Sequence, residues 1–189
     1  IATGNTGNVG PANFYRNQRT PEDATKTVSR AFLGIRMDCA QCHHHPFEKW
    51  GQADFYGLAG FFNGMQRVKL DDNRELIYHP GHQSIAIPVI NQAVQTQPLA
   101  GTPTTADNTT DPRPELAAWV TSPQNPFFAR LVANRIWKHL LGRGLVEPED
   151  DFRETNPPTN PELLDHLSEL LIENDFDLRD LMRKILNSH

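Results

Sequence analysis

Both cysteines of this 189-residue chain lie in one short motif, Cys39-Ala40-Gln41-Cys42-His43. Two thiols at this spacing share a helical turn, and the next residue directs an imidazole from the same side. The C-x-x-C-H pattern is typical of covalent haem attachment, in which each thiol forms a thioether and the histidine binds iron. Chance placement of two cysteines and eight histidines produces it on the order of once in a few thousand such chains. We therefore predict that Cys39 and Cys42 hold one haem c and that His43 is its proximal axial ligand.

Two other interpretations of the motif stay open. Zinc bound by Cys39, Cys42, His79 and His82 would form a closed tetrahedral structural site, although only two residues separate the two histidines. This zinc site would leave His43 without a role. A disulfide across the two cysteines is the third interpretation, and its geometry would be strained and redox-active.

The haem iron has a second axial position, and its occupant sets the redox potential or leaves the site open to small molecules. The candidates for this position are His139, His79, His82, Met65 and His45. His44 and His45 follow the proximal ligand too closely to reach the opposite face of the same haem with ease. Large aromatic side chains near the motif are expected to form a haem wall, or simply the core of the fold: Trp50, Phe55 and Phe62.

Charge and hydropathy exclude several classes of function. The net charge of -5 makes nucleic acid an improbable partner. No apolar run approaches the ~20 residues that a membrane helix needs, so no membrane span is expected. The 15 prolines and the hydrophobic content of 38% indicate a folded chain rich in loops.

Local patterns predict mostly helical elements with one hairpin. Capping residues followed by proline, as in Thr20-Pro21, Asn125-Pro126 and Asn160-Pro161, mark the start of three helices. Apolar spacing predicts helices over 20–37, 52–62, 114–120, 125–142, 160–174 and 177–189, a hairpin over 67–80 and a strand over 84–90. Leucines of the last two helices are expected to form a small helical core.

The expected fold class is mainly α with a small β-hairpin, short strands and long loops. It consists of a c-type haem domain followed by a helical segment. The expected domains are a cytochrome c-like haem-attachment domain over residues 1–90, a linker or long loop over 91–113, and a helical segment over 114–189. Glutamine, threonine and proline dominate the middle segment.

The first half resembles the planctomycete cytochrome-like domain family of unknown function. That family's motif runs F-L-G, C-A-Q-C-H-x-H-P-F, a Trp and Y-G-x-x-x-F-F, and all four parts occur here in order between residues 32 and 62. Residues 125–188 resemble the start of the planctomycete-specific domain that usually follows it. The two resemblances together span residues 1–90 and 114–189. They imply an exported protein, often part of a larger chain, in which His45 and His139 recur beside the motif; His44 departs from the family's usual Asp or Asn.

From motif and resemblance together we expect a c-type cytochrome that transfers electrons outside the cytoplasm, in the periplasm, at the cell surface or in the medium. Its partners would be redox proteins or other haem domains, and a homo-oligomer or multi-haem assembly is compatible with the sequence. The alternatives are a haem enzyme with an open distal site, in which His45 or His139 assists catalysis, and a zinc-stabilised structural module.

Overall fold

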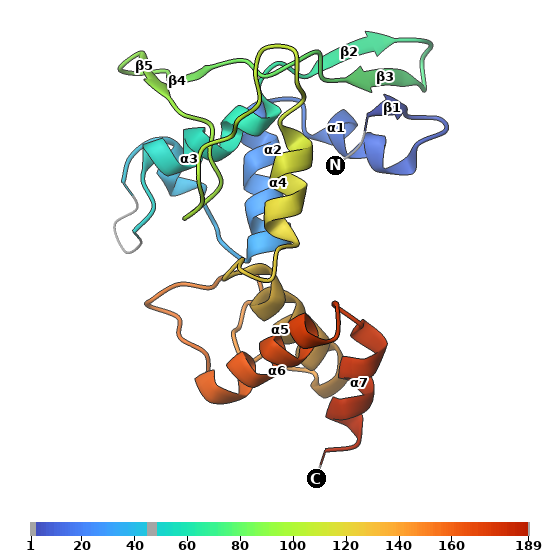
Figure 1. Ribbon diagram of the computed structural model, residues 1–189, viewed down its shortest axis with the longest axis vertical. Helices are drawn as coiled ribbons and strands as arrows, with labels where there is room; N and C mark the ends of the chain where they lie inside the picture. Colours follow the sequence, from blue (N-terminus) through green and yellow to red (C-terminus); the bar gives the residue numbers. More distant parts are fainter. Residues whose placement is uncertain (1–2, 45–48, 189) are drawn as a thin grey trace. The chain divides into compact units, whose positions relative to one another are not determined.

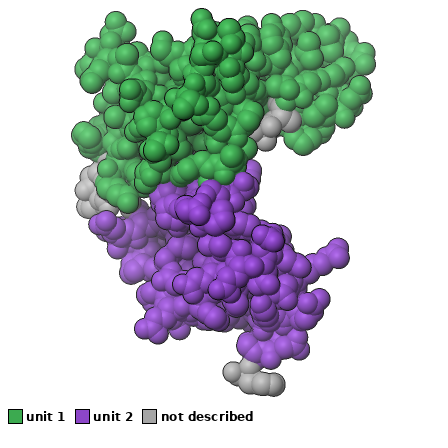
Figure 2. Space-filling view, in the orientation of Figure 1, with its two compact units in different colours: residues 1–27, 37–45, 49–119 green, residues 28–36, 46–48, 120–189 purple. Residues whose placement is uncertain are grey.

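The computed structural model describes residues 3–44 and 49–188, shown as a ribbon in Figure 1. These residues form two compact units, coloured separately in Figure 2. Of the described residues, unit 1 comprises 3–27, 37–44 and 49–119, and unit 2 comprises 28–36 and 120–188. Unit 2 therefore includes a short stretch from the first part of the chain.

Unit 1 contains a three-stranded antiparallel sheet in the order β1-β3-β2 (Figure 1). The strands are β1 (Gly4–Asn5), β2 (Gln66–Lys69) and β3 (Glu75–Tyr78). In the predicted hairpin, now confirmed, Val68 pairs with Leu76 and Arg67 pairs with Ile77. Because side chains alternate across a sheet, Ile77 faces the core while Leu76 and Val68 face outward and are partly exposed.

A second, two-stranded sheet joins β4 (Ile85–Ile87) to β5 (Gln92–Val94). The strand predicted over 84–90 is thus confirmed, in shorter form. Its partner β5 lies within the segment 91–113, and α4 (Arg113–Val120) begins where that segment ends. Backbone hydrogen bonds also join the segment to the rest of unit 1, as between the Gln97 amide and the Gly57 carbonyl at 3.1 Å.

The short helices of unit 1 enclose its core. They are η1 (Gly10–Asn13), α1 (Phe14–Asn17), α2 (Pro21–Val28), η3 (Cys39–Gln41), α3 (Gln52–Ala59), η4 (Gly60–Phe62) and α4. Thr20 caps α2 as predicted, since its hydroxyl accepts the Asp23 amide at 3.1 Å. α3 and η4 are buried almost all round, with Phe55, Phe61 and Phe62 fully enclosed, because the sheets and other helices cover them.

A buried arginine ties the first and last parts of unit 1 together. The Arg113 side chain is 2% exposed and pairs with Asp111, with 2.7 Å between its Nη2 and the Oδ2 of the carboxylate. Its Nη1 donates to the hydroxyl of Tyr15 at 2.9 Å. Because a buried guanidinium without partners would be very costly, this network fixes α4 against α1.

Unit 2 is built on α5 (Phe128–Leu141), α6 (Pro161–Glu173) and α7 (Leu178–Leu186). The cap predicted at Asn160 is confirmed, since its side chain accepts the Leu163 amide at 3.0 Å. The cap predicted at Asn125 is wrong: its side chain accepts the Phe128 amide at 2.9 Å, but α5 begins at Phe128 and its N-cap is Phe127. Gly142 ends α5 with a φ of 81°. The helical core predicted from the leucines forms, with these buried members: Ala133, Leu145, Val146, Leu164, Leu167, Leu171, Leu181 and Ile185.

The helix predicted over residues 20–37 is too long. Its α-helical part ends at Val28 and continues as a π-helical turn, η2 (Ser29–Leu33), that belongs to unit 2. Gly34 then stops it in the left-handed conformation, with a φ of 69°. The Phe152 amide donates to the Gly34 carbonyl at 2.8 Å, so a contact distant in sequence fixes this end.

The fold class expected from the sequence is wrong. Among the described residues, helix accounts for 43% and strand for 10%, with seven α-helices and two small sheets, so this part of the chain is a mixed structure with many turns. Within residues 3–44 and 49–188, no group of three or more His, Cys, Asp or Glu side chains is assembled that could hold a metal ion. A c-type haem domain is therefore not the architecture seen. Local helix signals could not reveal the β4–β5 pairing or the early end of α2.

Within the same described ranges, every helix is too short or too polar to cross a lipid bilayer. This finding agrees with the expectation that the chain contains no membrane span.

Candidate functional site

The C-x-x-C-H motif forms one exposed turn on the surface of unit 1. The amides of Cys42 and His43 both donate to the Cys39 carbonyl at 3.2 Å, which closes the turn. Ala40 points inward and is 1% exposed, so it anchors the turn on the core. The side chains of Cys39, Cys42 and His43 are left in solvent.

Both thiols of the turn are free. The disulfide interpretation of the motif thus has no counterpart in the structure, because the chain contains only these two cysteines. Two reduced, accessible sulfur atoms on one turn are able to react with a second molecule.

The imidazole of His43 is held in one tautomer. Its Nδ1 lies 2.6 Å from the backbone carbonyl oxygen of His44. A carbonyl oxygen can only accept, so Nδ1 is the donor of this bond, and in the neutral imidazole the lone pair lies on Nε2. The nitrogen that remains available to a metal is therefore Nε2, the one remote from the backbone.

Two side chains of helix α3 form hydrogen bonds with the turn. The Gln52 side chain donates through Nε2 to the Gln41 carbonyl at 3.2 Å. Tyr56, one helical turn further on and 4% exposed, forms a side-chain hydrogen bond with Gln41. Burial raises the pKa of the Tyr56 phenol, and negative charge on Glu22 and on Cys42 raises it further. Tyr56 thus lies close enough to Cys42 for a thiolate there to raise the pKa of the phenol.

Sequence reasoning missed Gln52 and Tyr56 as parts of this site. Their i, i+4 spacing on the first helix after the motif was the available signal, because such residues share one helix face. The prediction considered only the apolar residues of that helix.

The imidazole of His44 packs against the start of α3. An added Cβ atom on Gly51 would lie 2.4 Å from Nδ1 of His44, so the absence of a side chain at Gly51 makes room for this ring. The adjoining end of α3 is closed by Asp54, whose carboxylate accepts the Gly51 amide at 2.8 Å.

The three aromatic residues predicted as a haem wall all lie in unit 1. Phe55 and Phe62 are 0% and 1% exposed and belong to the packed core. Trp50 is 7% exposed, and the ammonium group of Lys49 lies 4.7 Å from the centre of its ring. As placed, Phe55 presents no free surface to a large planar group, and Phe62 only lines a cavity of about 200 Å³.

Two of the histidines proposed as distal ligands, His79 and His82, lie near α4 and the loop before it. His79 is buried, and its Nδ1 accepts the Gly81 amide at 3.3 Å, which leaves the proton on Nε2. Burial lowers the pKa of His79, while nearby Asp111 raises it and Arg113 lowers it. His82 engages the Thr96 hydroxyl through Nε2 at 2.8 Å. Both rings thus have local structural roles.

The remaining distal candidates are scattered. Met65 lines a cavity near the start of α2. His139 is an exposed residue of α5 in unit 2. His45 lies outside the residues that the structure describes.

The zinc alternative required Cys39, Cys42, His79 and His82 to converge. Among the residues described, no three His, Cys, Asp or Glu side chains meet closely enough to bind a metal ion, so these four residues do not form a zinc site in this structure.

Comparison with protein families gives two matches on separate parts of the chain. Residues 3–67 match PSCyt2, described as a protein of unknown function (DUF1549). Residues 112–189 match PSD1, described as a protein of unknown function (DUF1553). Both are planctomycete-type domains. No characterised protein and no solved structure shows significant similarity to the chain.

Proposed function

We propose that the turn over Cys39–His43 attaches one haem c and that the chain transfers electrons outside the cytoplasm. The observation that carries this proposal is the hydrogen bond from His43 Nδ1 to the His44 carbonyl. It directs the lone pair of Nε2 away from the backbone, as an axial ligand requires. The two free, exposed thiols beside it supply the attachment points.

The residues of the turn fit this group chemically. Each thiol would add to one vinyl group of the porphyrin, and His43 would bind the iron. The bound haem would supply the one-electron chemistry, while the protein controls access and polarity around it. Tyr56 and Gln52 of α3, which both form hydrogen bonds with Gln41, would hold the Cys42 side of the attachment in place.

The location and partners of the protein follow from the same chemistry. Thioether formation requires reduced thiols to meet haem outside the reducing cytosol, so the proposal places the protein in an extracytoplasmic compartment. Because the turn is exposed, the edge of the haem would be accessible to another redox protein or to another haem domain. An exposed haem edge favours electron transfer over catalysis in an enclosed pocket.

Expression of the full chain in a host with an active cytochrome c maturation system tests the proposal. We expect a Soret band, a c-type pyridine haemochrome and a mass increase of one haem that survives denaturation. The Cys39→Ser/Cys42→Ser variant should lose all three signals. His44→Gln, a change next to the turn that removes neither thiol, is the matched control and should keep them.

Colourless wild-type protein, obtained from cells in which a reference cytochrome matures normally, would refute the proposal. If the wild-type protein does carry haem, binding of carbon monoxide distinguishes an electron carrier from a haem enzyme. A carrier with both axial positions filled should bind the gas slowly, whereas rapid binding and a high-spin spectrum would favour an enzyme. Stoichiometric zinc in the colourless protein would favour the structural module.

A further inference from the structure

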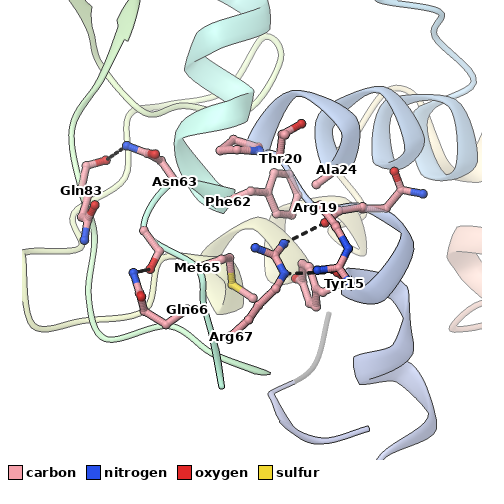
Figure 3. Close-up of a pocket in the computed structure, with 13 residues that line it drawn as sticks. Tyr15, Arg19, Thr20, Ala24, Phe62, Asn63, Met65, Gln66, Arg67 and Gln83 are labelled. Carbon is pink, nitrogen blue, oxygen red and sulfur yellow. Dashed lines mark hydrogen bonds between the residues drawn. The ribbon is translucent and has the colours of Figure 1, made fainter. Parts of the chain in front are cut away.

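A cavity of about 200 Å³ lies in unit 1, away from the C-x-x-C-H turn, and Figure 3 shows the residues that line it. One wall is apolar and comes from Ala24, Phe62 and Met65. The rest of the lining is rich in side-chain amides, those of Gln18, Asn63, Gln66 and Gln83. Nothing in the proposed haem function uses this cavity.

The side chain of Arg67 extends from β2 into the lining of the cavity (Figure 3). Its Nε donates to the Tyr15 carbonyl at 3.3 Å and its Nη2 to the Gln18 carbonyl at 3.0 Å. These two bonds fix the plane of the guanidinium. They leave one hydrogen of Nη1 and the second hydrogen of Nη2 side by side on the free terminal edge of the group, where a planar anion can accept two parallel bonds.

The guanidinium of Arg67 has a carboxylate nearby, that of Glu75, but this carboxylate forms its ion pair with Arg19. Within the two described ranges, no carboxylate forms an ion pair with this guanidinium. The neighbouring cation, Arg19, is already paired with Glu75 at 3.2 Å. Burial lowers the pKa of Arg67 and the charge of Arg19 lowers it further, whereas the charge of Glu75 raises it. One fixed positive charge thus remains at the edge of a partly apolar cavity.

We propose that this cavity binds a small organic carboxylate, with its carboxylate on Arg67 and its apolar body against Phe62 and Met65. The size of the cavity is below the range for drug-sized ligands, so the occupant is a fragment-sized acid. A single unpaired guanidinium matches one carboxylate in charge and in bidentate geometry. A phosphate dianion would call for a second free cation, which the Arg19–Glu75 pair does not provide.

Titration calorimetry of the full chain with benzoate tests this inference, with benzamide as the neutral analogue and inorganic phosphate as the competing anion. We expect saturable binding of one benzoate and at least tenfold weaker binding of benzamide and of phosphate. The variant Arg67→Gln should weaken benzoate binding at least tenfold. Arg74→Gln removes an exposed arginine that pairs with Asp71 outside the cavity, and it should leave binding unchanged.

A second variant covers the case in which Arg67→Gln fails to fold. Gln83 is exposed at the rim of the cavity, so Gln83→Glu adds a negative charge without touching the bonds of Arg67. It should weaken benzoate binding several-fold and leave benzamide unaffected. Absence of saturable benzoate binding would overturn the inference. Equal binding of benzoate and benzamide, tighter binding of phosphate, or unchanged binding by folded Arg67→Gln would overturn it as well.

Discussion

The guanidinium of Arg113 donates to the hydroxyl of Tyr15 at 2.9 Å, across 98 positions of the sequence. Both side chains are buried, at 2% and 1% exposure. The same guanidinium is held by Asp111 on its other edge. This relationship makes the stability of unit 1 depend on two residues that lie far apart along the chain.

We expect Tyr15→Phe to lower the free energy of unfolding by about 1.5–3 kcal/mol, because it removes a hydrogen bond to a buried charged group. Arg113→Met should cost more, about 3–5 kcal/mol, since it leaves Asp111 without its partner. Urea denaturation followed by circular dichroism measures both. Lys69→Gln breaks only an exposed pair with Asp72 and should change stability by less than about 1 kcal/mol. A loss of similar size in all three variants would contradict the role assigned to this network.

His79 should make the stability depend on pH. Its pKa is lowered by burial, so the folded state binds fewer protons at this site than the unfolded state, whose pKa is about 6.5. The contribution is present above that value and is lost as the pH falls toward the folded pKa. The decrease in urea midpoint between pH 7.5 and 5.5 should be smaller in His79→Gln than in wild type. His139→Gln, a change at an exposed site, should reproduce the wild-type decrease, and an identical decrease in all three proteins would refute the assignment.

The core of unit 2 depends on a reciprocal pair between Asn134 and Val146. The Asn134 amide donates to the Val146 carbonyl at 2.9 Å and accepts the Val146 amide at 3.0 Å, and its side chain is fully buried. Asn134→Ala should therefore cost about 2–4 kcal/mol, because two buried backbone groups lose their partners. Thermal or urea unfolding checks this value. In the control Asn174→Ala, an exposed bond to the Leu170 carbonyl is lost, and we expect less than about 1 kcal/mol.

Gly60 approaches Thr96 too closely to carry a side chain. An added Cβ atom would lie 2.0 Å from the Thr96 hydroxyl oxygen. Gly60→Ala should destabilise the protein by about 1–3 kcal/mol through overpacking. Combining it with Thr96→Ala should cost less than the sum of the two single changes, which a double-mutant cycle measures. Gly10→Ala, where no atom lies within 4 Å of the added Cβ, should be nearly neutral; additive effects at Gly60 and Thr96 would exclude the contact.

Local signals in the sequence were sufficient for elements whose ends are set by neighbouring residues. The caps at Thr20 and Asn160 were readable because the capping side chain bonds to an amide three positions away. The hairpin over β2 and β3 was readable for a similar reason, since its turn residues lie between two short alternating runs.

Features fixed by distant contacts were not readable. The end of the helix at Leu33 depends on Phe152 reaching Gly34, 118 positions later. The hydrogen bond from Arg113 to the Tyr15 hydroxyl likewise joins residues 98 positions apart. In the candidate site, the motif identified Cys39, Cys42 and His43. The hydrogen bond that selects the tautomer of His43, and the support from Tyr56, are products of folding.

The boundaries of the two folded units do not coincide with those of the two family matches. Unit 2 contains residues 28–36, which lie in the PSCyt2 match, and unit 1 contains residues 112–119, which lie in the PSD1 match. Replacing the part of the chain that matches one family, and leaving the part that matches the other, would therefore cut through the hydrophobic cores of both units. The two segments are expected to be inherited together, as one evolutionary module rather than as two that can be shuffled independently.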